Sequence, residues 1–518
     1  MEVRDFIDLK KVRFGSPAAE RDPGLYEYFV ESDAYRRVAE GTKRIVIGNR
    51  GAGKSAIFQV MASRERRQSN TSVIELSPED YSYELLKETM VSELDGSWRK
   101  ESAYAAAWKY LIYVLVMKAL TRDGDRGSKS SSLGKIARYV RDNHAGGQND
   151  KFSALISYLK RLEGVKVGPY EAGMKVRELQ KLYKLEEVTD LIPNLRDVLD
   201  RHRVVIFVDE LDRGWDESED AKAFVAGLFQ ACITLNSLHP NLRLYMSLRQ
   251  ELYENIPAIY DDAQKVRDLT EYVKWDEVGL QRLMNQRIRF TLSESLHGHA
   301  QPELQALPDE LMWSLIFSET LTYRQSNSFN YLIDRTLYRP REIIQFATQI
   351  VEQALTEARG APLDYASIVV AEHSYSEERA QDIAAEYRFQ FADLLAVFEA
   401  FRGRTFTFDR DELEDLCLEI LVEDKPSSVD HRWMDGYDPE HLIEVLWRVG
   451  FLKAQAVGGI KGRARSGSTY LGPYQAGSLN LGSISRFQVH PMYRSWLAMR
   501  EPKGDNTSTA RKPRGDSA

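Results

Sequence analysis

The fold of this chain is constrained most by one stretch, Gly48-Asn49-Arg50-Gly51-Ala52-Gly53-Lys54-Ser55. It matches the pattern G-x-x-x-x-G-K-[ST] at every fixed position. The mostly apolar run 44–47 before it predicts a buried strand, and the run 56–63 after it predicts a helix. A chance match in a glycine-rich turn is the alternative, but a strand, a loop and a helix in this order favour a phosphate-binding loop.

The residue types in this loop suit an anionic ligand. Glycines let the backbone turn tightly and aim its N–H groups inward, and the N-terminus of the following helix adds positive potential. Lys54 can reach the β- and γ-phosphates of a nucleotide, and the Ser55 hydroxyl can ligand Mg²⁺. We therefore expect all eight residues to bind ATP, with Ser55 also at the metal.

A second apolar run, 203–208, predicts a strand that ends at Asp209 and Glu210. An acidic pair after a buried strand is the second half of an ATPase site. Asp209 would hold Mg²⁺, directly or through water, and Glu210 would polarise the attacking water as a general base. An acidic loop without a catalytic role is the alternative, and the phosphate loop makes it the weaker one.

Two arginines are candidates for sensing the γ-phosphate during catalysis. Arg249 follows the predicted strand 242–248, and ligands of open α/β sheets lie at the carboxyl ends of strands. Arg341 lies in Arg339-Pro340-Arg341, where the proline suits the first turn of a helix. For each arginine, an ordinary ion pair with Asp or Glu is the competing interpretation.

The bulk composition narrows the class of protein. A length of 518 residues predicts about three domains, and the net charge of −8 argues against a wholly basic protein that coats nucleic acid. Cys232 and Cys417 form no metal or disulfide framework, which favours a reducing compartment. His297 and His299, the one close histidine pair in the sequence, are expected in an exposed turn.

The sequence predicts no membrane segment. The N-terminus is charged and has no apolar signal core. The most apolar run, 110–117, is far shorter than the roughly 20 residues that a membrane span needs, so it predicts a core helix. These features predict a cytoplasmic protein that does not bind a membrane.

The order of predicted elements divides the chain into five segments. They are a leader at 1–40, a core at 41–276 with a helical basic insertion at about 80–200, a helical lid at 277–375, a winged-helix-like domain at 385–500 and a disordered tail at 501–518. The leader, with a predicted helix at 25–30, either folds over the nucleotide base or only packs against the core. Further strands are predicted at 71–76 and 272–275, and a polar connector at 376–388.

Two stretches are locally basic. From 118 to 184 there are fifteen Lys or Arg against seven Asp or Glu, and from 451 to 490 there are five basic residues and no acidic one. The first is either a solvated helical face or a surface for nucleic acid or an acidic partner. The second carries Lys461, Arg463 and Arg465 and would be a hairpin, because a helix, a short strand, two helices and a hairpin is the order of a winged-helix domain.

With these motifs in place, the chain resembles bacterial STAND- and KAP-like P-loop ATPases, relatives of the AAA+ and origin-recognition ATPases. The resemblance rests on the Gly48–Ser55 loop, the Val208–Asp212 box, Arg249 and the Arg339–Arg341 helix start, and it covers residues 12–375. It implies a sheet of order 5-1-4-3-2, an ATP-controlled lid and self-assembly into a homo-oligomer. Roles in phage defence or as DNA-linked switches are suspected for members. The family usually has Arg-Ser-Asp or Arg-Thr-Asp after the fourth strand, whereas Gln and Glu follow the arginine here.

The sequence therefore predicts an α/β ATPase switch whose nucleotide state controls assembly or a partner. The alternative is a winged-helix regulator that binds nucleic acid and for which ATP is secondary. The third predicted helix of that domain, 438–449, carries three acidic residues against His441 and Arg448, which disfavours base reading by this helix. A scaffold that never hydrolyses ATP is disfavoured by Glu210.

Overall fold

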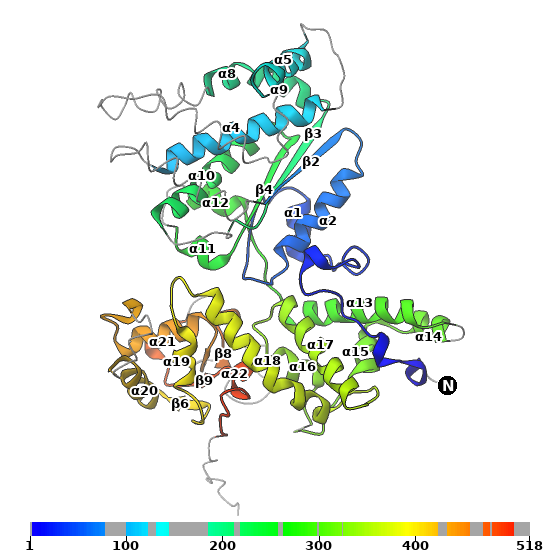
Figure 1. The fold of residues 1–518 in the computed structure, drawn as a ribbon, viewed down its shortest axis with the longest axis vertical. Coiled ribbons are helices and arrows are strands. Elements are labelled where there is room, and N and C mark those ends of the chain that lie inside the picture. The colour runs from blue at the N-terminus through cyan, green and yellow to red at the C-terminus, as the bar shows by residue number, and fades with distance from the viewer. Residues whose placement is uncertain are drawn as a thin grey trace, which may run out of the picture. The chain divides into compact units, whose positions relative to one another are not determined.

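The computed structural model contains two compact units (Figure 1). The first consists of Met1–Trp313 with Arg339–Ile344, and the second of Ser314–Tyr338 with Gln345–Ala518. The structure describes residues 3–77, 100–122, 131–144, 185–211, 218–256, 263–297, 300–323, 325–422, 432–455, 470–476 and 479–501. The finer division into five segments stays a prediction.

The first unit is built on a five-stranded parallel sheet. Its strands are β1 (Ile45–Ile47), β2 (Thr71–Leu76), β3 (Arg203–Val208), β4 (Leu242–Leu248) and β5 (Thr270–Tyr272). They lie side by side in the order β5-β1-β4-β3-β2, which reads 5-1-4-3-2. The expected strand at 272–275 is wrong in its position, because β5 ends at Tyr272 and the indole of Trp275 turns to hydrogen bond with the phosphate loop.

Helices cover the sheet on both faces. Those of the first unit are η1 (Val3–Phe6), η2 (Leu9–Lys11), η3 (Ala19–Arg21), α1 (Asp33–Ala39), α2 (Lys54–Arg66), α4 (Lys100–Thr121), α5 (Ser132–His144), α8 (Leu185–Asp190), α9 (Ile192–Leu199), α10 (Glu219–Asn236), α11 (Gln250–Glu254), α12 (Ala263–Leu269), α13 (Glu277–Ser295), α14 (Ala300–Ala306) and η5 (Asp309–Leu311). Alternate residues of β3 face opposite sides. Val204 and Ile206 pack in a core with α4 and α10, whereas Val205 and Phe207 pack in a second core with α1 and α2 (Figure 1).

The described part of the expected insertion between β2 and β3 is helical and consists of α4, α5, α8 and α9. The predicted core helix 110–117 lies within α4. In the same helix, the buried Trp108 donates through Nε1 to the carbonyl of Phe224 at 3.1 Å. Among the described residues, no helix has the length and apolar character that a membrane crossing requires. Most of the basic stretch 118–184 lies outside the described residues.

The second unit combines helices with a four-stranded sheet of order β6-β9-β7-β8, whose pairs are all antiparallel. Helix α15 (Met312–Ile316) spans the boundary with the first unit, and α17 (Pro340–Thr356) begins in the first unit and continues into the second. The remaining elements are α16 (Ser328–Ile333), α18 (Tyr365–Glu386), α19 (Leu394–Glu399), β6 (Thr407–Asp409), α20 (Arg410–Val422), η6 (Arg432–Met434), α21 (Pro439–Arg448), β7 (Leu452–Gln455), β8 (Tyr470–Leu471), η7 (Leu481–Ser483), β9 (Arg486–Val489) and α22 (Pro491–Arg494).

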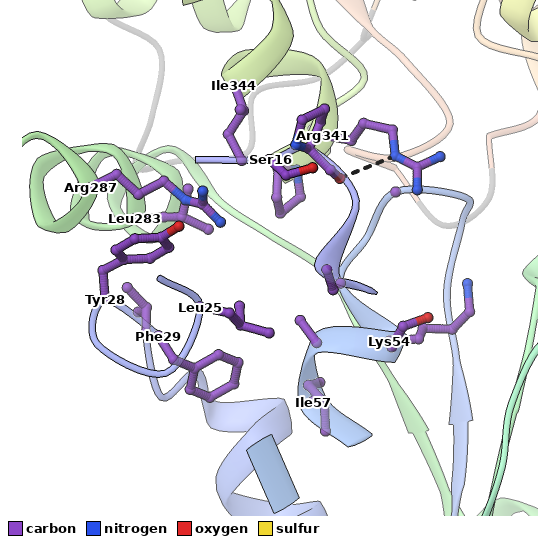
Figure 2. A pocket seen from close by; sticks show the side chains of 18 of the residues that line it. Ser16, Leu25, Tyr28, Phe29, Lys54, Ile57, Leu283, Arg287, Arg341 and Ile344 are labelled. Carbon is purple, nitrogen blue, oxygen red and sulfur yellow. Dashed lines mark hydrogen bonds between the residues drawn. The ribbon is translucent and has the colours of Figure 1, made fainter. Parts of the chain in front are cut away.

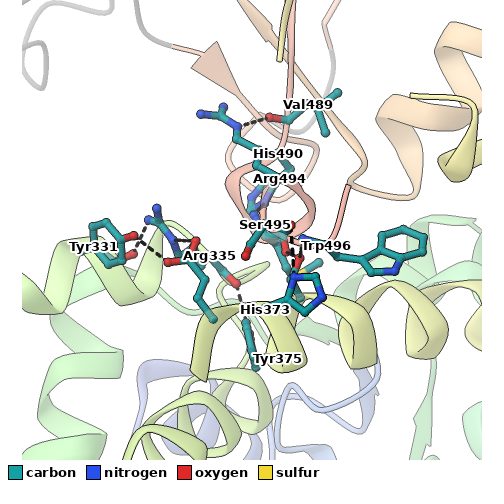
Figure 3. A network of polar contacts seen from close by, with 12 residues as sticks. Tyr331, Arg335, His373, Tyr375, Val489, His490, Arg494, Ser495 and Trp496 are labelled. Atoms are coloured by element: carbon teal, nitrogen blue, oxygen red, sulfur yellow. Dashed lines mark hydrogen bonds and ion pairs between the residues drawn. The ribbon is translucent and has the colours of Figure 1, made fainter. Parts of the chain in front are cut away.

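A buried polar network joins α18 to the segment that follows β9 (Figure 3). The Ser376 hydroxyl donates to the carbonyl of Met492 at 2.6 Å, and the backbone N–H of Trp496 donates to the same hydroxyl at 3.2 Å. Arg335 donates through Nε to Oε1 of Glu372 on α18 at 2.7 Å. These bonds satisfy polar groups that burial would otherwise leave without partners.

Two elements expected from the sequence are wrong. The stretch 376–388 is not a connector, because α18 continues to Glu386 and turns Ser376 and Arg379 toward the interior. The stretch 25–30 forms turns rather than a helix, because the chain bends to bring the Tyr28 hydroxyl to Asp22.

The hairpin residues Lys461, Arg463 and Arg465, like His299, lie outside the described residues, whereas His297 is exposed.

Gly227 on α10 sets how closely this helix approaches α4. A Cβ built there would lie 2.7 Å from the backbone nitrogen of Ala105 and 2.8 Å from the carbonyl carbon of Tyr104.

We expect Gly227→Ala to destabilise the first unit by about 1–3 kcal/mol, because a clash with backbone outweighs the gain of roughly 1 kcal/mol in helix propensity. Thermal unfolding checks this. Gly360→Ala, where a Cβ meets nothing within 4 Å, is the control; equal melting temperatures for both variants would contradict the close packing.

His490 is fully buried in the second unit and predicts a pH dependence. Its Nδ1 accepts the N–H of Met492 at 3.1 Å, so Nε2 carries the proton and donates to the hydroxyl of Tyr474 at 2.7 Å. Burial and the nearby cations Lys453 and Arg494 hold the pKa of His490 well below its ordinary value. The unfolded chain takes up this proton near pH 6.5, so it binds more protons than the folded chain below that pH and stability falls.

We therefore expect the melting temperature of the second unit to fall between about pH 7 and pH 5, as the unfolded histidine titrates. The His490→Gln variant removes the titrating group and should show a smaller fall. Equal slopes of melting temperature against pH for the two proteins would contradict this assignment.

Candidate functional site

The glycine-rich loop joins β1 to α2 at the carboxyl edge of the parallel sheet. Gly51 and Gly53 have φ of +77° and +95°, a region that glycine adopts without strain. The N–H of Gly48 donates to the carbonyl of Leu248 at 3.3 Å, so backbone hydrogen bonding fixes the loop to the end of β4. Arg50, at the outer side of the loop, is exposed.

Lys54 and Ser55 occupy the first two positions of α2. The Lys54 ammonium donates to the carbonyls of Gly48 at 2.6 Å and Asn49 at 3.0 Å, so it lies across the loop. The N-terminus of α2 leaves backbone N–H groups and positive potential at the same place. A cation, a hydroxyl and N–H donors thus gather where phosphate oxygens could bind.

Asp209 and Glu210 follow β3 at the same edge. The Ser247 hydroxyl of β4 donates to Oδ1 of Asp209, and the backbone N–H of Asp209 donates to the carbonyl of Leu76 at 3.0 Å. Glu210 has a φ of +57°, a left-handed conformation that costs roughly 1–2 kcal/mol in a residue with a Cβ. Backbone strain of this kind concentrates at functional sites.

The strand register brings the loop and the acidic pair together. Ile47 at the end of β1 is opposite Leu248 of β4, and Val208 at the end of β3 is opposite Met246. Within the described residues no group of three His, Cys, Asp or Glu could hold a metal ion. The oxygen atoms of Ser55 and Asp209 are the kind of ligand that Mg²⁺ prefers, and their role as metal ligands stays a prediction.

Arg249 lies where the sequence predicts it, directly after β4. It is the N-cap residue of α11, and its Nη1 lies 3.8 Å from Oε1 of the buried Glu251. The structure thus brings Arg249 near a carboxylate, as the ion-pair interpretation requires. Its role as a γ-phosphate sensor stays a prediction.

Arg341 reaches the phosphate loop from the first turn of α17. Its backbone N–H donates to the carbonyl of Gly51 at 3.4 Å, and its Nε donates to the carbonyl of Pro17 in the leader at 3.4 Å. A Cβ on Gly51 would lie 2.8 Å from the Cβ of Arg341, so the loop needs glycine here. Arg339 differs, since it is buried and lies 3.6 Å from Glu342.

A cavity of about 110 Å³ lies beside the loop, between the leader, α2, α13 and the start of α17 (Figure 2). Most of its wall is apolar, and its polar lining lies both beside the loop and beside the leader, where Arg287 contacts Tyr28 (Figure 2). Its apolar lining includes Leu25, Phe29, Ile57, Leu283 and Ile344, and the cations in the lining are Lys54, Arg341 and Arg287. This lining suits a ligand that has an apolar part and an anionic part.

Sequence reasoning missed much of this wall. The Trp275 indole donates to the carbonyl of Ala52 at 2.8 Å, and Arg287 of α13 lines the cavity beside Tyr28. One signal was present, because Arg287 lies four positions after Leu283 and three after Met284, which places it on the apolar face of the helix. The sequence leaves open whether the leader folds over a nucleotide base or only packs against the core. In the structure, residues of the leader line the cavity.

Three comparisons relate this chain to known proteins. Residues 279–384 match the model of the FunZ-associated C-terminal helical domain. The chain is 23% identical over 503 residues to the "Putative transposon gamma-delta 80.3 kDa protein" of Escherichia coli (strain K12), covering 95% of this chain and 68% of that protein.

Two solved archaeal structures are similar over most of their length. The Aeropyrum pernix ORC2 protein, solved in ADPNP–ADP complexes, has a TM-score of 0.37 and 10% identity, covering 92% of this chain and 96% of that one. Cdc6p from Pyrobaculum aerophilum has a TM-score of 0.28 and 9% identity, with 84% and 91% covered. At these scores neither structure assigns a function, and the fold rests on the sheet and loop described above.

The anion-binding character of the loop can be tested without a nucleotide. We expect Lys54→Ala to weaken binding of inorganic tripolyphosphate by about 10- to 100-fold, because a charge-assisted hydrogen bond contributes about 1.5–3 kcal/mol. Isothermal titration calorimetry measures it. Lys135→Ala, at an exposed position of α5, is the matched control. Equal affinities for the Lys54 variant and the wild type would remove the lysine from the site.

Proposed function

We propose that this protein is an ATPase in which the bound nucleotide acts as a switch. One observation carries the proposal: the phosphate loop and the Asp209–Glu210 pair extend from one edge of the sheet, beside a cavity with an apolar wall. The phosphates would lie against the loop N–H groups and Lys54, and the base would lie in the apolar part of the cavity. This division matches the amphiphilic character of a nucleotide.

The residues divide the chemical work among themselves. Lys54 would neutralise charge on the β- and γ-phosphates, and Ser55 with Asp209 would hold Mg²⁺, which supplies further charge neutralisation when bound. Glu210, which has a left-handed backbone conformation, would orient a water molecule and accept its proton. Positioning and electrostatics of this kind account for most of phosphoryl-transfer catalysis.

The switch would act through Arg341. This residue contacts both the loop and the leader, and the helix that carries it continues from the first unit into the second. A change in phosphate content beside Arg341 would therefore bias the start of α17. Self-assembly into a homo-oligomer, cytoplasmic location and γ-phosphate sensing by Arg249 belong to the same proposal.

A nucleic-acid regulator is the second candidate. The order α19, β6, α20, α21 and β7–β9 supports a winged-helix-like domain. Against base reading, Glu440 and Glu444 are exposed on α21 and line a groove with Trp447. The printed name of the Escherichia coli relative associates that protein with a transposon, which supports a DNA-linked switch more than phage defence.

We expect Glu210→Gln to keep ATP affinity near that of the wild type and to slow phosphate release by about 10²- to 10⁴-fold, because the amide cannot accept the proton of water. Calorimetry measures binding and a phosphate-release assay measures turnover. Glu219→Gln, at an exposed position of α10, is the matched control and should hydrolyse ATP normally. Wild-type turnover in the Glu210 variant would remove this residue from the mechanism.

A further inference from the structure

The leader is fixed to α13 by a buried charged cluster beside the cavity; Figure 2 shows two of its members, Arg287 and Tyr28. Nη1 of Arg287 lies 3.0 Å from Oδ2 of Asp22, and the two side chains are 7% and 0% exposed. Arg287 also donates to the carbonyl of Phe14, and the Tyr28 hydroxyl donates to Asp22. The Arg287 guanidinium lies 4.4 Å over the centre of the Tyr28 ring. One side chain of α13 thus contacts the leader at two separate places, Phe14 and Asp22.

A second attachment lies one turn further along α13. The backbone N–H of Arg13 donates to Oγ1 of Thr291 at 3.2 Å, and the Thr291 hydroxyl donates to the carbonyl of Arg13 at 2.7 Å. Gly15 follows in a left-handed conformation, with φ +75°, and a Cβ there would collide with both Tyr28 and Arg287. The leader is thus attached to α13 at two places, one turn of the helix apart.

This cluster belongs to the wall of the cavity and not to the phosphate loop. Arg287 and Tyr28 line the cavity together with Leu25 and Phe29 of the leader. The loop is held by contacts outside this cluster, from the end of β4, from Trp275 and from the backbone N–H of Arg341, whose side chain also reaches the leader at Pro17. Loss of the cluster should therefore disturb the apolar end of the cavity and spare the loop.

We propose that Arg287 and Asp22 are positioning residues that hold the leader as the base-binding wall, so that they set the affinity for the base of a nucleotide and not for its phosphates. The inference rests on the proposed function. A wall ordered before binding lowers the entropy lost when the base enters, whereas a detached leader must be ordered by the ligand itself. Removal of one member of the pair also leaves the other charge buried and uncompensated.

The test compares ATP with inorganic tripolyphosphate, which has the phosphates and no base. In Arg287→Ala we expect ATP affinity to fall by about tenfold or more, which corresponds to the loss of a pre-ordered wall, and tripolyphosphate affinity to stay within about twofold. Arg282→Ala, at an exposed position of the same helix, is the matched control and should change neither affinity. The double variant Asp22→Asn/Arg287→Gln removes both charges at once and keeps the experiment informative if the single variant does not fold.

The outcomes separate the two levels of the proposal. A selective loss of ATP affinity in either variant supports the positioning role. Unchanged ATP affinity, or an equal loss for ATP and tripolyphosphate, overturns it. If the wild type binds tripolyphosphate and ATP equally well, the base makes no contribution and this inference alone fails. If the wild type binds neither compound, the proposed function fails with it.

Discussion

Parallel pairing of β1 with β4 is the interaction on which the candidate site depends. It sets the end of β1 beside Leu248, whose carbonyl accepts the N–H of Gly48, and so determines where the glycine-rich loop begins. The other neighbour of β4 is β3, and Ser247 bonds across to Asp209. Burial of all three residues of β1 stabilises this arrangement from both faces of the sheet. A shift of register would separate the loop from the acidic pair.

The parts of the site that sequence reasoning predicted depend on local chemistry. Glycines at Gly51 and Gly53 are required by the backbone of the loop itself, and the apolar runs before Gly48 and Asp209 indicate buried strands without knowledge of their partners. The leader wall could not be predicted in this way, because Arg13 and Thr291 meet across 278 positions of the chain. No local pattern records such a contact.

The same reason explains the errors. Ser376 and its neighbours are polar, and polarity predicts a solvated connector. In the structure this hydroxyl donates to Met492, 116 positions away, and accepts the N–H of Trp496, 120 positions away, which makes a polar residue suitable for a buried helix face. Each unit also contains an arginine–carboxylate pair that is shielded from solvent. The pair is Arg287 with Asp22 in the first unit and Arg335 with Glu372 in the second. Each pair joins two segments of its unit, and loss of one partner would leave the other charge buried and uncompensated.

The strand order also fixes when the site can form during synthesis. Arg44, which precedes β1, hydrogen bonds with Tyr245 of β4 across 201 positions of the chain. At about 5–20 residues per second, a ribosome needs roughly 10–40 s to make the intervening chain. The glycine-rich loop is therefore translated early and acquires its neighbours late, after the apolar helix α4 has also left the ribosome without α10 to cover it. The nascent chain passes through a period in which its most apolar segment and its unpaired strand edges are exposed together.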